Sequence, residues 1–472
     1  MPHDRLVPLI VAVALFMENM DATVIATSLP AIAVDLGTNP LALKLAVTSY
    51  LLSLAVFIPV SGWTADRFGA RTVFRAAIGV FMLGSIGCAF SGSLSQFVAA
   101  RIVEGMGGAM KTPVGRLILV RSVDRRELVN AMVWVTTPAL IGPVIGPAVG
   151  GFITTYFHWQ WIFFINSPIG FAGILLSTWY IEDIRAEKPD PFDFRGMLLA
   201  GFGIAGLAFG LSVLGLDFLP PAVVAALIAG GTLATFLYVL HARRTPAPVL
   251  DLSLLSLPTL RASVVGGFVY RTGVGALPFL LPLLLQLGFH LTPFQSGLIT
   301  LTSAVGAMTM KMVVPVILRR VGFRNTLTAN AVISAVFVAA CAAFTPTTPL
   351  VVMIAILLAG GFFRSLQFTS LATIAYAELD PRSISRATPL VSVSQQLSVS
   401  TGVAVGALAV DLTLYVRQHT MVTAADFAPA FLLIGLISAT SALMFARLPE
   451  DAGAELANRT PAPTEESDQR LG

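Results

Sequence analysis

The sequence predicts an all-α polytopic membrane protein, and its composition and hydropathy pattern carry this prediction. Apolar residues make up 56% of the 472 residues and charged residues only 11%, with a mean hydropathy of +0.83. Apolar runs of about twenty residues recur along the chain, and this is the length that an α-helix needs to cross a bilayer. A helix satisfies its own backbone hydrogen bonds within lipid, so each run predicts a membrane-spanning helix.

Proline, glycine or charge bounds each apolar run, which gives fourteen candidate spans. In order, they cover residues 8–35, 43–64, 73–91, 96–120, 130–153, 161–181, 196–215, 221–241, 262–287, 294–318, 323–344, 349–376, 388–412 and 427–446. Short cytoplasmic loops of membrane proteins carry an excess of Lys and Arg. Alternate loops here carry most of the cationic residues, whereas the opposite loops offer only Lys44 and Arg417. This asymmetry predicts an even number of spans with both termini in the cytoplasm.

Five segments are expected from this order of spans. They are an N-terminal six-helix bundle at 1–190, two inserted transmembrane helices at 191–245, a cytoplasmic linker at 246–261, a C-terminal six-helix bundle at 262–449 and a disordered cytoplasmic tail at 450–472. An internal repeat favours two related halves, because Gly69 and Arg71 match Gly322 and Arg324 at one offset (322 − 69 and 324 − 71 both give 253). The inserted pair is nearly free of charge, so we expect it to pack beside the bundle rather than to bind solute.

The fourth predicted span contains charges that lipid alone would not tolerate. Arg101, Glu104 and Lys111 share one face of a helix at this spacing. Each charge costs about 3 kcal/mol at the centre of a bilayer, so a polar pathway through protein is the leading explanation. Glu18 and Asp21 lie one turn apart in the first span, with Asp21 at a depth similar to that of Arg101. We therefore expect a carboxylate–arginine contact between the first and fourth spans.

Four motifs resemble those of the major facilitator superfamily, and within it the fourteen-span drug/proton antiporters of the EmrB/QacA type. They are GWTADRFGAR at 62–71, RIVEGMGG at 101–108, GPVIGPAVGG at 142–151 and MENMDATVIATSLP at 17–30. The runs GGAMKTPVGRL at 107–117 and LHAR at 240–243 resemble the MdtD-like subgroup. The resemblance implies a major facilitator fold, with two six-helix bundles plus two inserted helices, 14 transmembrane helices in all.

The resemblance assigns a cytoplasmic latch and an antiporter motif. The latch comprises Gly62, Asp66, Arg67, Gly69 and Arg71, with Asp66 expected near a helix N-terminus. Its departures from the family pattern imply a weaker latch. The alternative interpretation is that these charged residues only set the orientation of the helices in the membrane. The antiporter motif comprises Gly142, Pro143, Gly146, Pro147, Gly150 and Gly151. It implies export, and the alternative is a purely structural glycine face that lets helices approach closely.

Proton coupling is expected in the cluster formed by the first and fourth spans. We expect Asp21 to carry the coupling proton beside Arg101, with Glu18 or Glu104 as relay. A static buried ion pair is the alternative. The family usually has glutamine at the position of Glu104, so this carboxylate either titrates or neutralises Arg101. The offset of the repeat also pairs Glu18 with Arg271 (271 − 253 = 18), which is the basis for a hypothetical charge gate across the cavity.

The predicted substrate cavity has a mixed charge. Its expected members are Asn19, Lys111, Arg271, Lys311, Arg364 and Gln367. The family resemblance implies a proton-coupled antiporter of the multidrug-efflux type that works by alternating access. Arginine forks suit carboxylates and phosphates, so the alternative substrate is an anionic metabolite such as citrate or a metal–citrate chelate. A transporter-like sensor is a third hypothesis.

Several other functions lack their sequence signals. There is no GxxxxGK loop for an ATP-driven pump, no zinc-ligand spacing and no basic tail for nucleic acid, so we expect no enzyme activity, metal or cofactor. The energy source would be the proton gradient, and the partners would be a small-molecule substrate, protons and the lipid bilayer. Cys88 and Cys341 are expected to be free core residues. We expect a monomer in a bacterial inner membrane; the sequence identifies no envelope-spanning partner.

Overall fold

The computed structural model describes residues 3–122, 128–182, 192–213, 216, 218–418 and 421–456. It describes no side chains at 3–5, 120–121, 128–140, 381–382 and 385. Helices dominate this part of the chain, and it contains no strand. The all-α class is therefore confirmed.

The N-terminal half comprises α1 (His3–Asp35), α2 (Lys44–Phe57), α3 (Ser61–Phe68), α4 (Ala70–Ala89), α5 (Leu94–Ser122), α6 (Leu128–Tyr156), α7 (Trp161–Phe164) and α8 (Asn166–Tyr180). The inserted pair is α9 (Phe194–Val213) and α10 (Pro221–Ala242). The C-terminal half comprises α11 (Pro258–Arg261), α12 (Gly267–Val274), α13 (Leu277–Leu283), α14 (Pro293–Val321), α15 (Phe323–Ala340), α16 (Leu350–Ile374), α17 (Pro381–Arg417), α18 (Ala424–Thr440) and α19 (Ala442–Phe445). Short turns of 3-10 or π-helix, such as η2 (Ile58–Val60), η3 (Leu252–Ser256), η4 (Ala262–Gly266) and η5 (Leu284–Gly288), join several of these helices.

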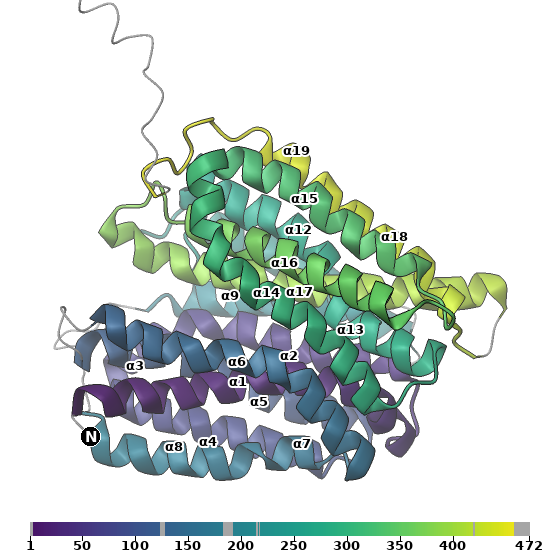
Figure 1. The fold of residues 1–472 in the computed structure, drawn as a ribbon. Coiled ribbons are helices and arrows are strands. Elements are labelled where there is room, and N and C mark those ends of the chain that lie inside the picture. Colours follow the sequence, from purple (N-terminus) through teal and green to yellow (C-terminus); the bar gives the residue numbers. More distant parts are fainter. Residues whose placement is uncertain are drawn as a thin grey trace, which may run out of the picture.

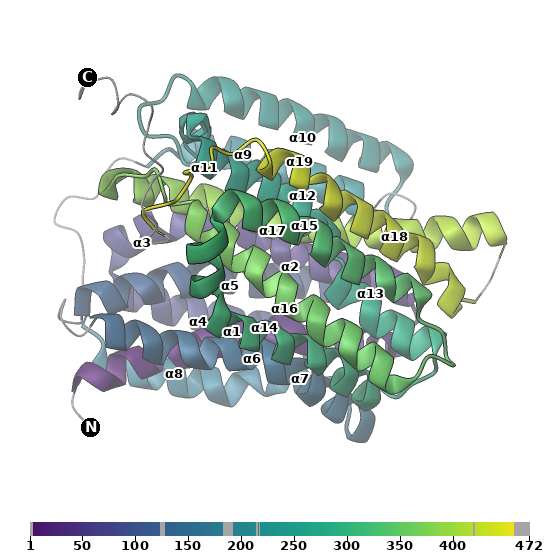
Figure 2. The same ribbon diagram turned by 45° about the horizontal axis from the view of Figure 1, so that its top comes forward.

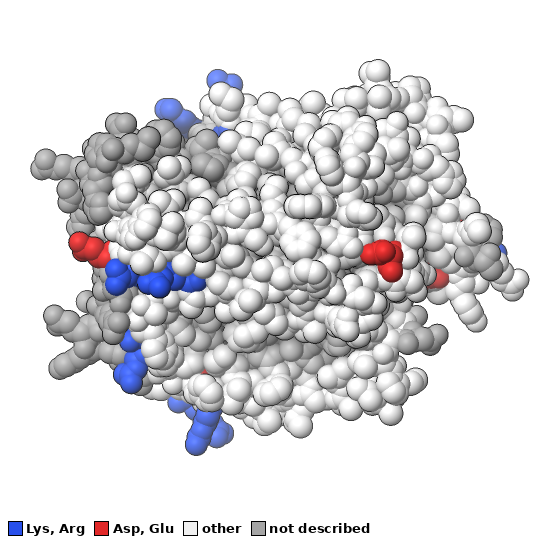
Figure 3. Space-filling view, turned by 90° about the horizontal axis from the view of Figure 1, so that it is seen from below, with Lys and Arg blue, Asp and Glu red and all other residues white. Residues whose placement is uncertain are grey.

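Twelve helical segments among the described residues are long and apolar enough to cross a membrane. They coincide with twelve of the predicted spans, so the protein is a multi-pass membrane protein. The other two predicted spans fall on α5 and α6, which are helical but are not among the twelve. Helix α5 has five charged residues, which makes it too polar to pass on composition alone. Figure 3 shows a broad uncharged surface, with Lys and Arg side chains gathered toward one end.

The two halves lie side by side as separate bundles, purple to blue and green to yellow in Figure 1. Between them, α6 packs on α14, α2 on α17 and α1 on α13. The inserted pair lies outside this core, where α9 packs on both α2 and α17 and α10 packs on α9 (Figure 2). The inserted helices therefore contact one helix of each half.

The internal repeat is visible at two loops. Gly69 has φ of +96° between α3 and α4, and Gly322 has φ of +82° between α14 and α15, a region that glycine adopts without strain. Arg71 Nη1 donates to the Ile181 carbonyl just after α8 at 3.3 Å, and Arg324 Nε donates to the Ala446 carbonyl just after α19 at 3.1 Å. In each half, the arginine that follows this glycine bonds to a backbone carbonyl just after the last helix. The predicted repeat is therefore confirmed.

Four further details of the predicted organisation concern Asp66, the tail, a domain boundary and the cysteines. Asp66 lies in the last turn of α3, which continues to Phe68 and stops at Gly69. The tail predicted as disordered from 450 is folded as far as the structure describes it: Glu450 pairs with Arg324 at 2.8 Å and Ala452 is buried. The predicted domain boundary at 190 and residues 457–472 lie outside the described residues. The two cysteines are buried and free, as predicted.

Candidate functional site

The charged residues of α5 meet the carboxylate of α1 inside the N-terminal half. Arg101 is buried, and its Nη1 lies 2.9 Å from Asp21 Oδ2 and 2.6 Å from Glu104 Oε2. The guanidinium also lies 4.2 Å from the centre of the Tyr50 ring, a cation–π arrangement. The predicted contact between the first and fourth spans is therefore present. Two carboxylates face one guanidinium, which leaves a formal charge of −1.

Sequence reasoning missed two polar side chains that hold this cluster. Asn166 of α8 donates from Nδ2 to Asp21 Oδ1 at 3.1 Å and to Ser85 Oγ of α4 at 2.9 Å. Both side chains are buried. Sequence analysis did not single out Asn166, although a lone Asn in an apolar span is a usable signal, since a buried amide requires partners.

Close helix packing explains why α4 and α5 are rich in glycine here. A Cβ at Gly84 would overlap the backbone of Glu104, and a Cβ at Gly107 would overlap that of Phe81. The small residues let the two helices approach closely, as in other membrane bundles. The Arg101 and Glu104 side chains are thereby held on rigid elements rather than on loops.

Glu18 and Lys111 belong to a second polar region, which lies nearer than Asp21 to the start of α1. Thr112 Oγ1 donates to Glu18 Oε2 at 2.8 Å. Lys111 is buried, and its Nζ lies 3.2 Å from the centre of the Phe81 ring. The ammonium therefore does not extend to solvent. Glu18 and Arg271, the hypothetical gate pair, have different partners here: Arg271 Nη1 lies 3.5 Å from the Ser263 carbonyl.

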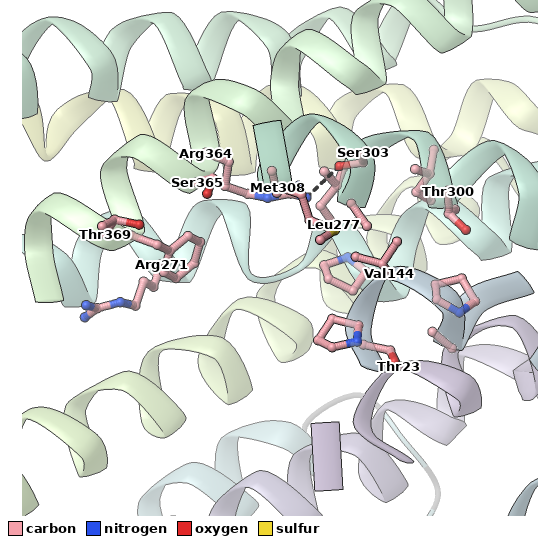
Figure 4. A pocket seen from close by; sticks show the side chains of 18 of the residues that line it. Thr23, Val144, Arg271, Leu277, Thr300, Ser303, Met308, Arg364, Ser365 and Thr369 are labelled. Carbon is pink, nitrogen blue, oxygen red and sulfur yellow. Dashed lines mark hydrogen bonds between the residues drawn. The ribbon is translucent and has the colours of Figure 1, made fainter. Parts of the chain in front are cut away.

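A cavity of about 660 Å³ lies between the halves (Figure 4). Helices α1 and α6 line it from the N-terminal half, and α12, α13, α14, α16 and α17 line it from the C-terminal half. Three predicted cavity residues, Arg271, Lys311 and Arg364, contribute to the lining. Among the residues that the structure describes, no Asp or Glu lines this cavity. Its charged lining residues are therefore all cationic.

The cationic residues of the cavity have no carboxylate partner within the described part of the chain. Arg364 Nη2 points toward Ser303 and donates to its Oγ at 2.7 Å, as Figure 4 shows. The Arg271 guanidinium lies 5.8 Å from the Phe368 ring centre. Neutral partners leave these charges uncompensated, so the cavity favours an anion.

The other three predicted cavity residues do not line it. Asn19 donates to the Leu15 carbonyl of its own helix at 2.9 Å. Lys111 lies inside the N-terminal half. Gln367 faces away from the cavity, accepting from Asn330 Nδ2 at 2.8 Å and donating to the Leu327 carbonyl at 3.1 Å. None of these three residues is therefore part of the cavity lining.

The predicted antiporter motif forms one wall of the cavity and its closed end. Pro143 and Pro147 line the cavity. A Cβ at Gly146 or Gly150 would overlap α1, and a Cβ at Gly151 would overlap Pro293 and Phe294 at the start of α14. These glycines allow α6 to contact α1 on one side and α14 on the other.

Further contacts between the halves gather at this same end of the cavity. A Cβ at Gly297 would overlap Pro147, and Gln286 Nε2 donates to the Thr27 carbonyl at 2.9 Å. Met308 and Lys311 line the opposite side of the cavity and are exposed. The cavity is therefore closed beyond Thr27 and accessible toward the end at which α1 begins.

Comparison of the sequence with known families decides the class of protein. The sequence description of the Major Facilitator Superfamily matches residues 11–260 and 263–468. The chain belongs to the major facilitator superfamily. Within this superfamily it is 38% identical over 451 residues, 94% of its own length and of the relative's, to the "Putative multidrug resistance protein MdtD" of Salmonella paratyphi B. It is 37% identical over the same lengths to the protein of that name from Cronobacter sakazakii, which supports the MdtD-like subgroup.

Solved structures of the major facilitator superfamily share the fold. A D-xylose–proton symporter has a TM-score of 0.68 at 14% identity, covering 95% of this chain and 98% of the symporter. The human organic anion transporter MFSD10 has a TM-score of 0.61 at 15% identity, covering 94% and 100%. These relatives are transporters of the major facilitator superfamily rather than enzymes, and this chain is a transporter of the same superfamily.

Proposed function

We propose that this transporter is a proton-coupled antiporter that exports small molecules from the bacterial cytoplasm by alternating access. The observation that carries the proposal is the buried Asp21–Arg101–Glu104 cluster, because its Asp21 lies on α1, the helix that also lines the central cavity through Thr23 and Thr27. The antiporter motif of α6 and the multidrug-resistance name of the relatives are consistent with export.

The same proposal includes an orientation. Fourteen spans, with α5 and α6 completing the set, put both termini on one side of the bacterial inner membrane, and the excess of Lys and Arg in alternate loops assigns that side to the cytoplasm. The charges of α5 do not exclude it, because Arg101, Glu104 and Lys111 are buried in protein instead of facing lipid. In this orientation the cavity is open to the cytoplasm and closed to the outside, and the loop at Gly62–Arg71 is a cytoplasmic latch.

Asp21 is the proposed proton carrier, with Glu104 or Glu18 as relay. The cluster has one negative charge more than Arg101 balances, and a proton removes that excess. Protonated Asp21 holds Arg101 less strongly, so protonation loosens the contact between α1 and α5. Because α1 also lines the cavity, a looser contact between α1 and α5 alters the surface that the substrate contacts.

The test is proton flux in proteoliposomes that contain a pH-sensitive dye. We expect Asp21→Asn to abolish substrate-driven proton movement. Asp35→Asn is the matched control, since Asp35 is also on α1 and accepts from Trp159 Nε1 at 3.0 Å, outside the cluster. If the Asp21→Asn protein still moved protons in step with substrate, the assignment would be wrong.

A second candidate concerns the substrate, which we propose to be an anion of the citrate or metal–citrate type. Arg271, Lys311 and Arg364 line the cavity, and none of its described lining residues is acidic, so these charges repel a lipophilic cation. Vesicles should therefore change lumenal pH on addition of citrate and not on addition of dye cations. Response to dye cations alone would support the multidrug type, and response to neither would favour the sensor.

A further inference from the structure

Two adjoining cavities lie outside the central one, between the inserted pair, the linker and the C-terminal half. The first, about 400 Å³, is lined by α9, α10, the linker, α12 and α17. The second, about 450 Å³, is lined by the end of α10, the linker and Arg386 of α17. Val239 and Leu252 line both cavities, so the two are neighbours with a shared wall. We name them the apolar chamber and the basic chamber.

The apolar chamber offers a ligand no hydrogen bonds. Its three polar side chains are already bonded within the protein: Thr235 Oγ1 donates to the Gly231 carbonyl, Ser394 Oγ donates to the Val264 carbonyl, and the Tyr238 hydroxyl bonds both backbone groups of Leu250. The remaining lining residues are aliphatic or aromatic, such as Val265 and Phe268. Hydrocarbon is the matching ligand chemistry.

The basic chamber has an excess of positive charge. Arg386 Nη1 pairs with Asp251 Oδ2 at 3.0 Å, and Asp251 is the one acidic residue of the lining. Arg243 is exposed, and no ion pair to a carboxylate of the described chain involves it. A guanidinium without a carboxylate partner suits a phosphate, to which it donates two parallel hydrogen bonds.

The walls of both chambers are held in place before any ligand binds. The Tyr238 hydroxyl donates to the Leu250 carbonyl at 2.7 Å, which fixes the linker to α10. His241 Nε2 lies 2.7 Å from Asp193 Oδ1, which fixes the end of α10 to the segment before α9. The Arg386–Asp251 pair fixes α17 to the linker. A preformed site loses less conformational entropy on binding.

We propose that these two chambers together form a binding site for one anionic phospholipid. An acyl chain fits the apolar chamber, and the phosphate fits the basic chamber beside Arg243 and Arg386. Basic pockets between transmembrane helices bind anionic lipid headgroups at the membrane surface, where α10 ends. A lipid in this site contacts α10, α12 and α17, and so connects the inserted pair to the helix that packs on α2 of the other half.

The test uses the purified full chain after removal of native lipid. Phosphatidylglycerol, phosphatidylcholine and inorganic phosphate are added separately, and bound lipid is counted by native mass spectrometry alongside thermal unfolding. We expect phosphatidylglycerol to bind, and Arg243→Gln to weaken it about fivefold, since one cation near a membrane surface contributes about this much. Arg244→Gln is the matched control, because Arg244 is also exposed but does not line the basic chamber.

A second variant tests the apolar chamber alone. Val265→Trp fills it from a side chain that is 37% exposed, and it should displace the lipid without altering either arginine. Val223→Trp is its control, since Val223 is 42% exposed on α10 and lines neither chamber. Equal binding of phosphatidylcholine and phosphatidylglycerol, equal effects of the two arginine variants, or equal stabilisation by inorganic phosphate alone would each overturn the proposal.

Discussion

Lys44 Nζ lies 3.4 Å from Asp411 Oδ2, an ion pair that joins α2 of the N-terminal half to α17 of the C-terminal half. The ammonium is buried, with 1% of its side chain exposed, and the carboxylate is 22% exposed. The pair lies at the same end of the cavity as the contact between Gly151 and Phe294. It therefore contributes to the closed end of the cavity.

Loss of this ion pair should open the closed end more often. Lys44→Met leaves Asp411 without its partner in the closed state, and each 1.4 kcal/mol lost shifts the balance about tenfold. A cysteine placed at cavity residue Ala304 should then react faster with an impermeant thiol reagent added from outside. The double variant Lys44→Asp with Asp411→Lys should restore the slow rate. Arg417→Gln is the control, because its pair with Asp426 joins helices of one half; equal labelling in both would contradict the role.

Removal of Arg101 should destabilise the protein strongly. Arg101→Ala leaves two buried carboxylates without their cation, and breaking a buried pair in this way costs about 3–5 kcal/mol. Thermal unfolding in detergent measures the loss. Arg116→Ala is the control on the same helix, since Arg116 is exposed. A similar midpoint for both variants would show that the cluster does not stabilise α5.

Glu104→Gln should weaken proton coupling without abolishing it, in contrast to Asp21→Asn. A glutamine carbonyl still accepts from Arg101 Nη1 and the Asp21 contact is kept, but the change removes the excess negative charge that favours proton uptake. Proton flux per exported substrate is the measurement. Loss of coupling in Glu104→Gln, with coupling retained in Asp21→Asn, would exchange the roles of the two carboxylates.

Larger residues at the glycine contacts between α6 and α14 should prevent closure. A Cβ at Gly297 already overlaps Pro147, so Gly297→Val should reduce transport at least about tenfold by the cost of that clash. Gly230→Val is a stringent control, because a Cβ there meets nothing within 4 Å. Amounts of each protein in the membrane must match, and normal transport by Gly297→Val would refute the closed-end role.

The local sequence pattern was sufficient to predict the features that depend on the residue spacing within one helix or one loop. The contacts of Arg101 with Asp21 and Glu104 were predicted because charges within apolar runs must find partners in protein. The glycines at 69 and 322 were matched because the two loops need the same backbone conformation. These inferences required no knowledge of how the helices are arranged around one another.

The features that depend on helix rotation could not be obtained in this way. Periodicity places Lys111 and Arg101 on one face of α5, but it does not show whether that face meets the cavity or α4. The contact of Lys111 with the Phe81 ring, on α4, shows that Lys111 faces α4. Asp411 lies 367 positions from Lys44, so nothing local relates the two. Gln367 was predicted in the cavity but lies outside it for the same reason, since its partner Asn330 lies on α15.

The hydrogen bond from Arg71 to the Ile181 carbonyl also bears on the order in which the protein assembles. All of its participants belong to the first 181 residues, so the bond needs nothing that is synthesised later. This bond can therefore form while the ribosome is still making α9 and α10. The second bundle has the equivalent bond from Arg324 to Ala446, which forms only when the last helix arrives. Each half thus holds its own last helix by a bond that does not depend on the other half.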